Sequence, residues 1–83
     1  MEDRFYIRTK KLVELVNCFE YPEYLLVFWK YNYEDDSETY EIFIDVEKKD
    51  EEPKIISFIL TYNEITGLDN CYENLYKEIR KQI

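Results

Sequence analysis

Residues 40–46 read YEIFIDV, and this stretch decides the fold. Its even-numbered positions hold large apolar side chains, and its odd-numbered positions hold a phenylalanine between two carboxylates. Because successive side chains of a strand point to opposite sides, this alternation predicts a strand with one apolar face. The segments 24–33 (YLLVFWKYNY) and 54–62 (KIISFILTY) are rich in β-branched and aromatic residues and are predicted strands as well. The short polar segments 34–39 and 48–53 predict an antiparallel meander with 40–46 in its centre.

The apolar pattern also predicts how the strands pair. Ile44 opposite Trp29 on one side and Phe58 on the other places only apolar or aromatic residues on one face. The same register aligns two further sets: Val27–Val46–Ile56 and Tyr31–Ile42–Leu60. A slip of one residue would destroy this agreement, because it would turn a whole strand over. We therefore expect Trp29, Ile44 and Phe58 to form the middle of the core.

Helices are predicted on both sides of the meander. The first has an apolar stripe at helical spacing and is ended by Pro22; the stripe is Leu12, Leu15, Val16 and Phe19. The second has the stripe Leu68, Tyr72, Leu75, Ile79 and Ile83. Asn70 and Glu73 resemble a capping box at its start. The expected fold class is α+β, with the order α-β-β-β-α and both helices on the apolar face of the sheet. Residues 2–7 fit either a helix start or an arm.

Size and composition indicate one folded domain, residues 1–83. The chain is 46% hydrophobic and 18% aromatic, which excludes disorder. No segment approaches the ~20 consecutive apolar residues of a membrane span, and no apolar signal-peptide region follows the N-terminus. Cys18 and Cys71 could pair, but two cysteines without a signal peptide favour a reducing cytosol, so the expected location is the cytoplasm of a host cell.

The net charge of the chain sits entirely in its middle third. Residues 34–64 carry eleven acids against Lys48, Lys49 and Lys54, a net charge of −8, which equals the formal charge of the whole protein. The segments on either side are balanced to zero. A field of this kind repels nucleic acid and anionic membranes and attracts cationic surfaces. We expect no direct contact with nucleic acid or membrane.

The sequence offers little that resembles catalytic chemistry. There is no histidine, and therefore neither the commonest general base nor the commonest metal ligand. Ser37 and Ser57 lack a glycine-rich elbow, and the two cysteines lack a histidine partner. The acids from Glu34 to Glu38 lack the pattern of a calcium loop, and a single glycine cannot build a phosphate-binding loop. The prediction is no enzyme, no metal and no cofactor.

The acids are instead predicted to form a surface for a protein partner. Glu41, Asp45 and Glu47 share the sheet face opposite the core, and the two turns add acids at opposite ends. Apolar residues are expected on the same face: Leu26, Phe28, Phe43, Ile55 and Ile59. The predicted partner-binding residues are Glu34, Asp35, Asp36, Glu38, Glu41, Asp45, Glu47, Asp50, Glu51, Glu52, Phe28 and Phe43. A merely solubilising face remains an alternative, as does covering by Phe5, Tyr6 and Ile7 or by a homodimer partner.

In charge and element order the whole chain is similar to some small acidic phage-encoded inhibitors, notably anti-CRISPR proteins and anti-restriction DNA mimics. The resemblance carries no residue role across. It implies a mechanism in which carboxylates stand in for phosphates on an Arg- and Lys-lined nucleic-acid channel, so the expected partner is a basic surface of a nucleic-acid-binding enzyme. Two other functions remain open: an adaptor that self-associates through an apolar sheet face, and an immunity protein against a basic toxin nuclease.

Overall fold

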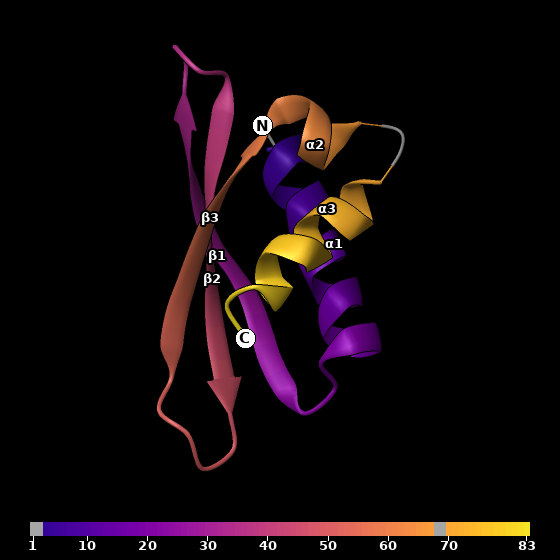
Figure 1. Ribbon diagram of the computed structural model, residues 1–83, viewed down its shortest axis with the longest axis vertical. Helices are drawn as coiled ribbons and strands as arrows, with labels where there is room; N and C mark the ends of the chain where they lie inside the picture. Colours follow the sequence, from indigo (N-terminus) through magenta and orange to yellow (C-terminus); the bar gives the residue numbers. More distant parts are fainter. Residues whose placement is uncertain (1–2, 68–69) are drawn as a thin grey trace.

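The three central segments form one antiparallel sheet with the strand order β1-β2-β3. The strands are β1 (Tyr24–Glu34), β2 (Thr39–Lys48) and β3 (Lys54–Thr61) in the computed structural model, which describes residues 3–67 and 70–83. The predicted meander, with its alternating strand in the centre, is confirmed. The helices form a second layer on one face of this sheet (Figure 1), and the fold is a two-layer α+β domain.

The helical layer contains α1 (Arg4–Glu20), α2 (Tyr62–Thr66) and α3 (Cys71–Arg80). Because α1 begins at Arg4, residues 4–7 belong to a helix and not to an arm. The short helix α2 was not predicted. It begins with a capping box, in which the Glu64 amide donates to the Thr61 hydroxyl (3.2 Å) and the Thr61 amide donates to the Glu64 carboxylate (2.8 Å).

The start of α3 differs from its prediction. Asn70 has a φ of 65° and makes no side-chain hydrogen bond to the helix, so the predicted capping box of Asn70 and Glu73 is wrong. A cap of that kind needs an extended backbone, and the left-handed backbone of Asn70 aims the side chain elsewhere. The predicted stripe residue Leu68 lies outside the described residues. Leu75 and Ile79 are fully buried, as predicted.

The core lies between the sheet and the helices. The buried apolar residues are Val13, Val16, Leu26, Phe28, Ile42, Ile44, Val46, Ile56, Phe58, Leu60, Ile65, Leu75 and Ile79. The predicted inward faces of β2 and β3 are confirmed. The face of α1 is partly wrong, because Leu15 and Phe19 are exposed. The buried residues of α1 are Thr9, Val13 and Val16. Val16 belongs to the predicted stripe, whereas Thr9 is polar and gives no apolar signal.

A β-bulge at Trp29 changes the register of β1. Tyr31 lies opposite Ile42, as predicted, but beyond the bulge Phe28 lies opposite Ile44. An extra residue turns the rest of the strand over. Phe28 is therefore 1% exposed and Trp29 is 46% exposed. The placement of Trp29 in the core is wrong, and so is the placement of Phe28 and Leu26 on the outer face.

The pairing of β2 with β3 also differs from the prediction, with less effect. Ile44 lies opposite Ile56 and Ile42 lies opposite Phe58, a shift of two residues from the predicted register. A shift of two residues leaves every side chain on its predicted face, because side chains alternate with a period of two. Phe58, at 8% exposure, is a core residue as expected.

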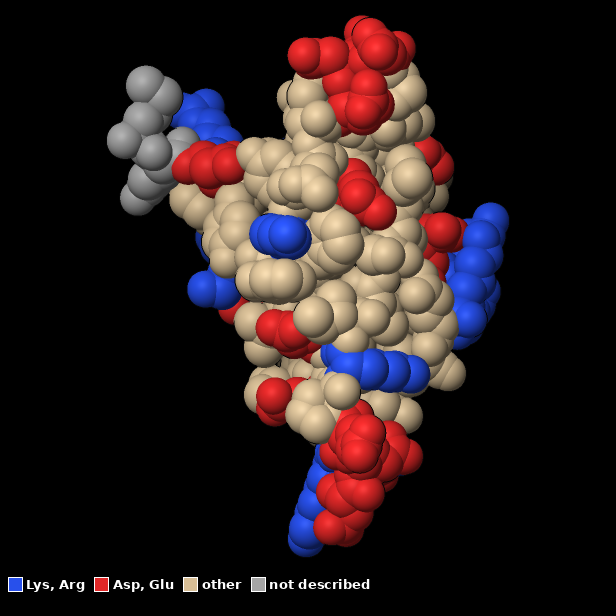
Figure 2. All heavy atoms as spheres, turned by 90° about the vertical axis from the view of Figure 1, so that its left-hand side faces the viewer, with Lys and Arg blue, Asp and Glu red and all other residues tan. Residues whose placement is uncertain are grey.

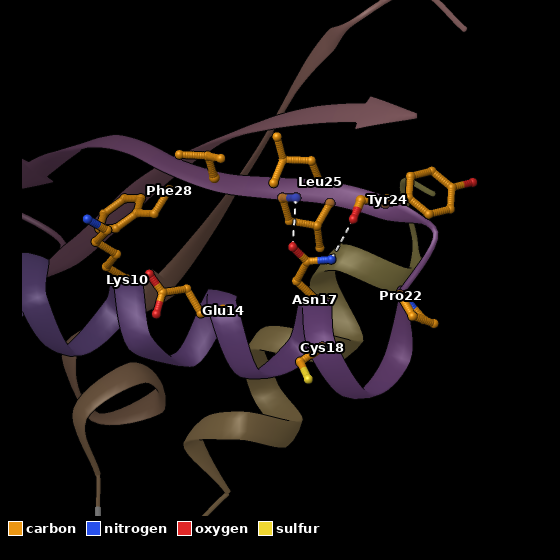
Figure 3. A pocket seen from close by; sticks show the side chains of 10 residues that line it. Lys10, Glu14, Asn17, Cys18, Pro22, Tyr24, Leu25 and Phe28 are labelled. Carbon is orange, nitrogen blue, oxygen red and sulfur yellow. Dashed lines mark hydrogen bonds between the residues drawn. The ribbon is translucent and has the colours of Figure 1, made fainter. Parts of the chain in front are cut away.

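Along residues 24–28, the free edge of β1 is closed by α1. The side-chain amide of Asn17 donates to the carbonyl oxygen of Tyr24 at 2.8 Å, and its oxygen accepts from the Leu26 amide at 3.1 Å (Figure 3). The same amide also donates to the carbonyl oxygen of Tyr21 at 2.8 Å. The Tyr6 hydroxyl donates to the Phe28 carbonyl at 3.5 Å. The contacts to Tyr24, Leu26 and Phe28 satisfy backbone groups that point away from β2, which would otherwise be available to another strand.

Asp3 ties the start of α1 to the sheet. One carboxylate oxygen accepts from the Tyr6 amide at 3.1 Å, and the other accepts from the Tyr31 hydroxyl at 2.5 Å. The Tyr31 hydrogen bond is the main cause that lowers the pKa of Asp3 below its ordinary value, with help from the Tyr6 amide. The same bond raises the pKa of Tyr31 to about 12, and burial of the phenol adds to the shift.

We expect the hydrogen bond between Asp3 and Tyr31 to stabilise the protein only at pH values between the range in which Asp3 titrates and the range in which Tyr31 titrates. The pKa of Asp3 is lowered by folding, so its contribution is present above 3.8 and is lost as the pH falls through the folded value. The pKa of Tyr31 is raised, so its contribution is present below 10 and is lost as the pH rises toward about 12. Denaturant unfolding of the parent and of Tyr31→Phe should therefore differ at neutral pH and converge at both extremes. Tyr62→Phe, at an exposed tyrosine, is the control; a Tyr31→Phe difference that stays constant with pH would contradict the assignment.

Candidate protein-binding surface

The sheet face turned away from the helices is the candidate surface, here called the outer face. The odd-numbered residues of β2 lie on it, opposite to the buried even-numbered ones. The flanking strands complete it, and the outer face comprises Leu25, Val27, Trp29, Lys30, Glu41, Phe43, Asp45, Glu47, Ile55, Ser57 and Ile59. Figure 2 views the molecule from this side. The carboxylates of β2 therefore do share one face, as their spacing indicates.

Apolar side chains flank the β2 carboxylates on this face. Asp45 lies opposite Val27 on one neighbouring strand and opposite Ile55 on the other. Glu41 lies opposite Ile59. Ile55 and Ile59 are each more than half exposed, at 53% and 59%, whereas Glu41 and Asp45 are half-buried. The outer face therefore combines carboxylates with several neighbouring exposed apolar groups, and exposed apolar groups that cluster in this way mark interaction sites.

The middle of the outer face holds an aromatic pair covered by a cation. The rings of Trp29 and Phe43 meet edge-to-face with centroids 6.1 Å apart. The Lys30 ammonium lies 4.6 Å from the Trp29 ring centroid and 5.1 Å from that of Phe43, distances at which a cation is attracted by the ring face. Trp29 is absent from the predicted site, because no pattern in the sequence marks the bulge that turns it outward.

The two turns place further acids at the opposite ends of the molecule, whose longest extent is 40 Å. Asp35, Asp36 and Glu38 are exposed in the turn between β1 and β2, and residues 50–52 are exposed between β2 and β3. Figure 2 shows acidic side chains gathered at both ends of the outer face and scattered acids between them. Glu38 and Asp50 have positive φ angles of 53° and 67°, a left-handed backbone of the kind that tight turns use.

Within the described residues, these carboxylates make no ion pairs. Among residues 3–67 and 70–83, the single salt bridge joins Lys81 to Glu78 at 2.8 Å, in the helical layer. The acids of β2 and of both turns therefore have no cation within 4.0 Å in the part of the chain that the structure describes. Their charge is available to a partner, because within the described residues no salt bridge engages it.

Other side chains that could take part in chemistry or binding lie elsewhere on the molecule. The Ser37 hydroxyl shares a 2.7 Å hydrogen bond with Thr39, and Cys18 and Cys71 are free thiols. A groove of about 500 Å³ runs between α1 and the edge of β1 (Figure 3). Its lining includes Lys10, Glu14 and Asn17, of which Asn17 is already bonded to β1. Within the described ranges, no cluster of three or more potential metal ligands occurs, and none of the helices there is long and apolar enough to cross a membrane.

The chain matches no protein-family model, no curated protein and no solved structure. The charge, burial and contacts of the outer face are therefore the basis for a functional proposal.

Proposed function

We propose that this chain is a non-enzymatic protein-binding module that inhibits a nucleic-acid-binding enzyme stoichiometrically, in the manner of anti-CRISPR proteins and anti-restriction DNA mimics. In this proposal the outer face and its two acidic turns occupy an Arg- and Lys-lined channel, and carboxylates take the places of phosphates. The observation that carries the proposal is the set of acids without ion pairs along one face, within the described part of the chain.

Carboxylates suit this role because arginine binds carboxylate and phosphate with the same two-pronged hydrogen bonds. The acids of the outer face lie on the central strand of a sheet, so their backbone is already ordered and only their side chains lose freedom on binding. Unneutralised charge at both ends of a 40 Å molecule also steers the encounter with a basic surface.

The aromatic pair supports a protein partner over a face that only keeps the molecule dissolved. Trp29 is half-exposed beside Phe43, and tryptophan is among the residues that contribute most to binding at protein interfaces. Solubility alone would place charged residues at these positions. Docking would bury the aromatic pair in the centre of the interface and leave the acidic turns at its rim.

The exposed apolar residues also favour a second candidate, an adaptor held by its apolar outer face. The two functions differ in their response to salt. Between about 50 and 500 mM salt the Debye length falls from roughly 14 to 4 Å, which screens exposed charges from each other. Binding through phosphate mimicry weakens steeply over this range, whereas binding through apolar contacts does not.

The test begins with capture of a partner from the cell that carries the gene, on immobilised protein, with identification by mass spectrometry. The expected partner is a nucleic-acid-binding enzyme that the purified chain inhibits at an equimolar ratio. Its dissociation constant should rise with salt, and the enzyme's own nucleic acid should compete for the same surface. A dissociation constant that stays flat with salt, or a complex that nucleic acid does not displace, would contradict phosphate mimicry. An immunity protein would give the same result with a toxin nuclease as partner.

A further inference from the structure

The two edges of the sheet differ in how they are protected. The edge of β1 is closed by Asn17 and Tyr6 along residues 24–28, as described above, and its remainder carries the charged residues Lys30 and Glu34. On the edge of β3, the Ser57 carbonyl accepts a hydrogen bond of 2.6 Å from the Gln82 side chain. The backbone of Ser57 therefore points away from β2, and by strand alternation the backbones of Ile55 and Ile59 point the same way. Among the described residues, no hydrogen bond reaches the amide or carbonyl group of Ile55 or Ile59 along this edge.

The exposed edge also lacks the features that usually prevent pairing with another chain. Residues 55–61 (IISFILT) contain no charge, proline or glycine. Ile55 and Ile59 are more than half exposed. Natural edge strands are normally protected by charges, proline, bulges or a covering element. The bulge of this sheet is in β1, so it does not protect β3.

From these observations we propose that β3 pairs with β3 of a second copy of this chain, antiparallel and about a two-fold axis at Ser57. In this register Ser57 lies opposite its own copy, and Ile55 lies opposite Ile59 of the partner copy. These positions all direct their backbone groups outward, so each pair can exchange two hydrogen bonds. The isoleucines then become cross-strand neighbours on the outer face. The edge is complementary to itself, which is the requirement for a two-fold interface.

The distribution of charge allows this pairing although each copy carries a net charge of −8. The contact itself would be made by the uncharged stretch 55–61, while the acidic turns lie beyond its ends. The repulsion between copies therefore acts at a distance, where salt screens it. Dimer formation should be favoured by salt, which is opposite to the effect expected for binding of a basic target.

Gln82 opposes the dimer. Its side-chain amide donates a hydrogen bond to the Ser57 carbonyl. The Lys54 ammonium donates to the backbone carbonyl of Gln82 at 3.3 Å, which helps to hold the chain end against the edge. Pairing exchanges the side-chain bond for a backbone bond from the second copy. A two-fold axis normal to the sheet leaves both helical layers on one side. The two outer faces then form one continuous face on a six-stranded sheet, so dimer formation would double the surface proposed for the target without covering it.

Sedimentation of the full chain over a concentration series tests the proposal at low and high salt. The expected result is a monomer–dimer equilibrium that shifts toward dimer as salt rises. Ile59→Lys should weaken the dimer by at least about tenfold, because it places a charge beside the partner's Ile55. The matched control is Leu25→Lys, an equal change at an equally exposed residue of the opposite edge, which should leave the dimer unchanged. Gln82→Ala should strengthen the dimer by freeing the Ser57 carbonyl.

The register has its own test. Ile55→Lys and Ile59→Glu should each weaken the dimer, and the double variant should restore it, because the two changed residues are neighbours only when Ser57 pairs with Ser57. A monomer at all concentrations and salts would overturn the proposal, as would a dimer that Leu25→Lys disrupts and Ile59→Lys does not. Circular dichroism of each variant identifies any loss of folding. Target binding is proposed to rest on the carboxylates of β2 and the two turns, whereas dimer formation rests on the backbone edge of β3. Sedimentation of the free chain and capture of the target therefore test the two proposals separately.

Discussion

Replacing Phe28 by alanine is expected to lower the free energy of unfolding by about 3–5 kcal/mol. Phe28 is 1% exposed, and its ring stacks on Tyr6 with centroids 4.9 Å apart and lies 6.4 Å from the ring of Tyr31. Truncation would leave a cavity between α1 and the sheet that these neighbours cannot fill. Small domains have roughly 5–15 kcal/mol of stability in total, so Phe28→Ala should melt far below the parent.

The matched control is the next residue. Trp29 is the larger side chain, but the bulge leaves it 46% exposed. Trp29→Ala should therefore cost only about 1 kcal/mol, mainly from contact with Lys30 and Phe43. Denaturant unfolding of both variants measures the difference. A greater loss for Trp29→Ala than for Phe28→Ala would show that β1 pairs in the register predicted from the sequence, without a bulge.

The second large effect is expected from reversing four acids, Asp35, Asp36, Glu41 and Asp45, to lysine. Four reversals of two charges each raise the formal net charge from −8 to zero. Loss of steering alone should reduce the association rate with the captured enzyme by about 10–1000-fold, and lysines facing a basic channel should abolish the complex. The fold should persist, because these side chains lie in an exposed turn or on the outer face and, within the described residues, none of them takes part in an ion pair.

A control variant with the same net charge as the first distinguishes the effect of the outer-face acids from the effect of total charge. Reversing Glu14, Glu20, Glu23 and Glu73 to lysine changes four acids outside the segment 34–64. This variant should keep a measurable complex with slower association. Surface plasmon resonance at several salt concentrations compares both variants with the parent. Equal loss of binding in the two variants would contradict docking through the outer face, because it would make total charge the sole determinant.

The sequence by itself determined the strand order, the inward face of the central strand and the concentration of charge in one segment. Each of these is a local property. The alternation from Tyr40 to Val46 assigns the two faces of β2 without reference to any neighbour, and the acids on its odd positions follow the same rule. The acidic turns and the acidic side of the candidate surface were predictable for this reason.

Tertiary structure decided which residues of β1 join the core and which form the surface. Alternation has a period of two, so it cannot locate an extra residue within a strand. The bulge placed Phe28 in the core and Trp29 on the surface, the reverse of the prediction. The pairing of β2 with β3 was ambiguous for a related reason, because a shift of two residues leaves the apolar faces unchanged. The protection of the edges depends on Asn17 and Gln82, which lie outside the strands whose backbone groups they bond, 9 residues from Leu26 and 25 residues from Ser57. Such contacts form only when the helices pack on the sheet, and polar residues at single positions carry no periodic signal that would predict them.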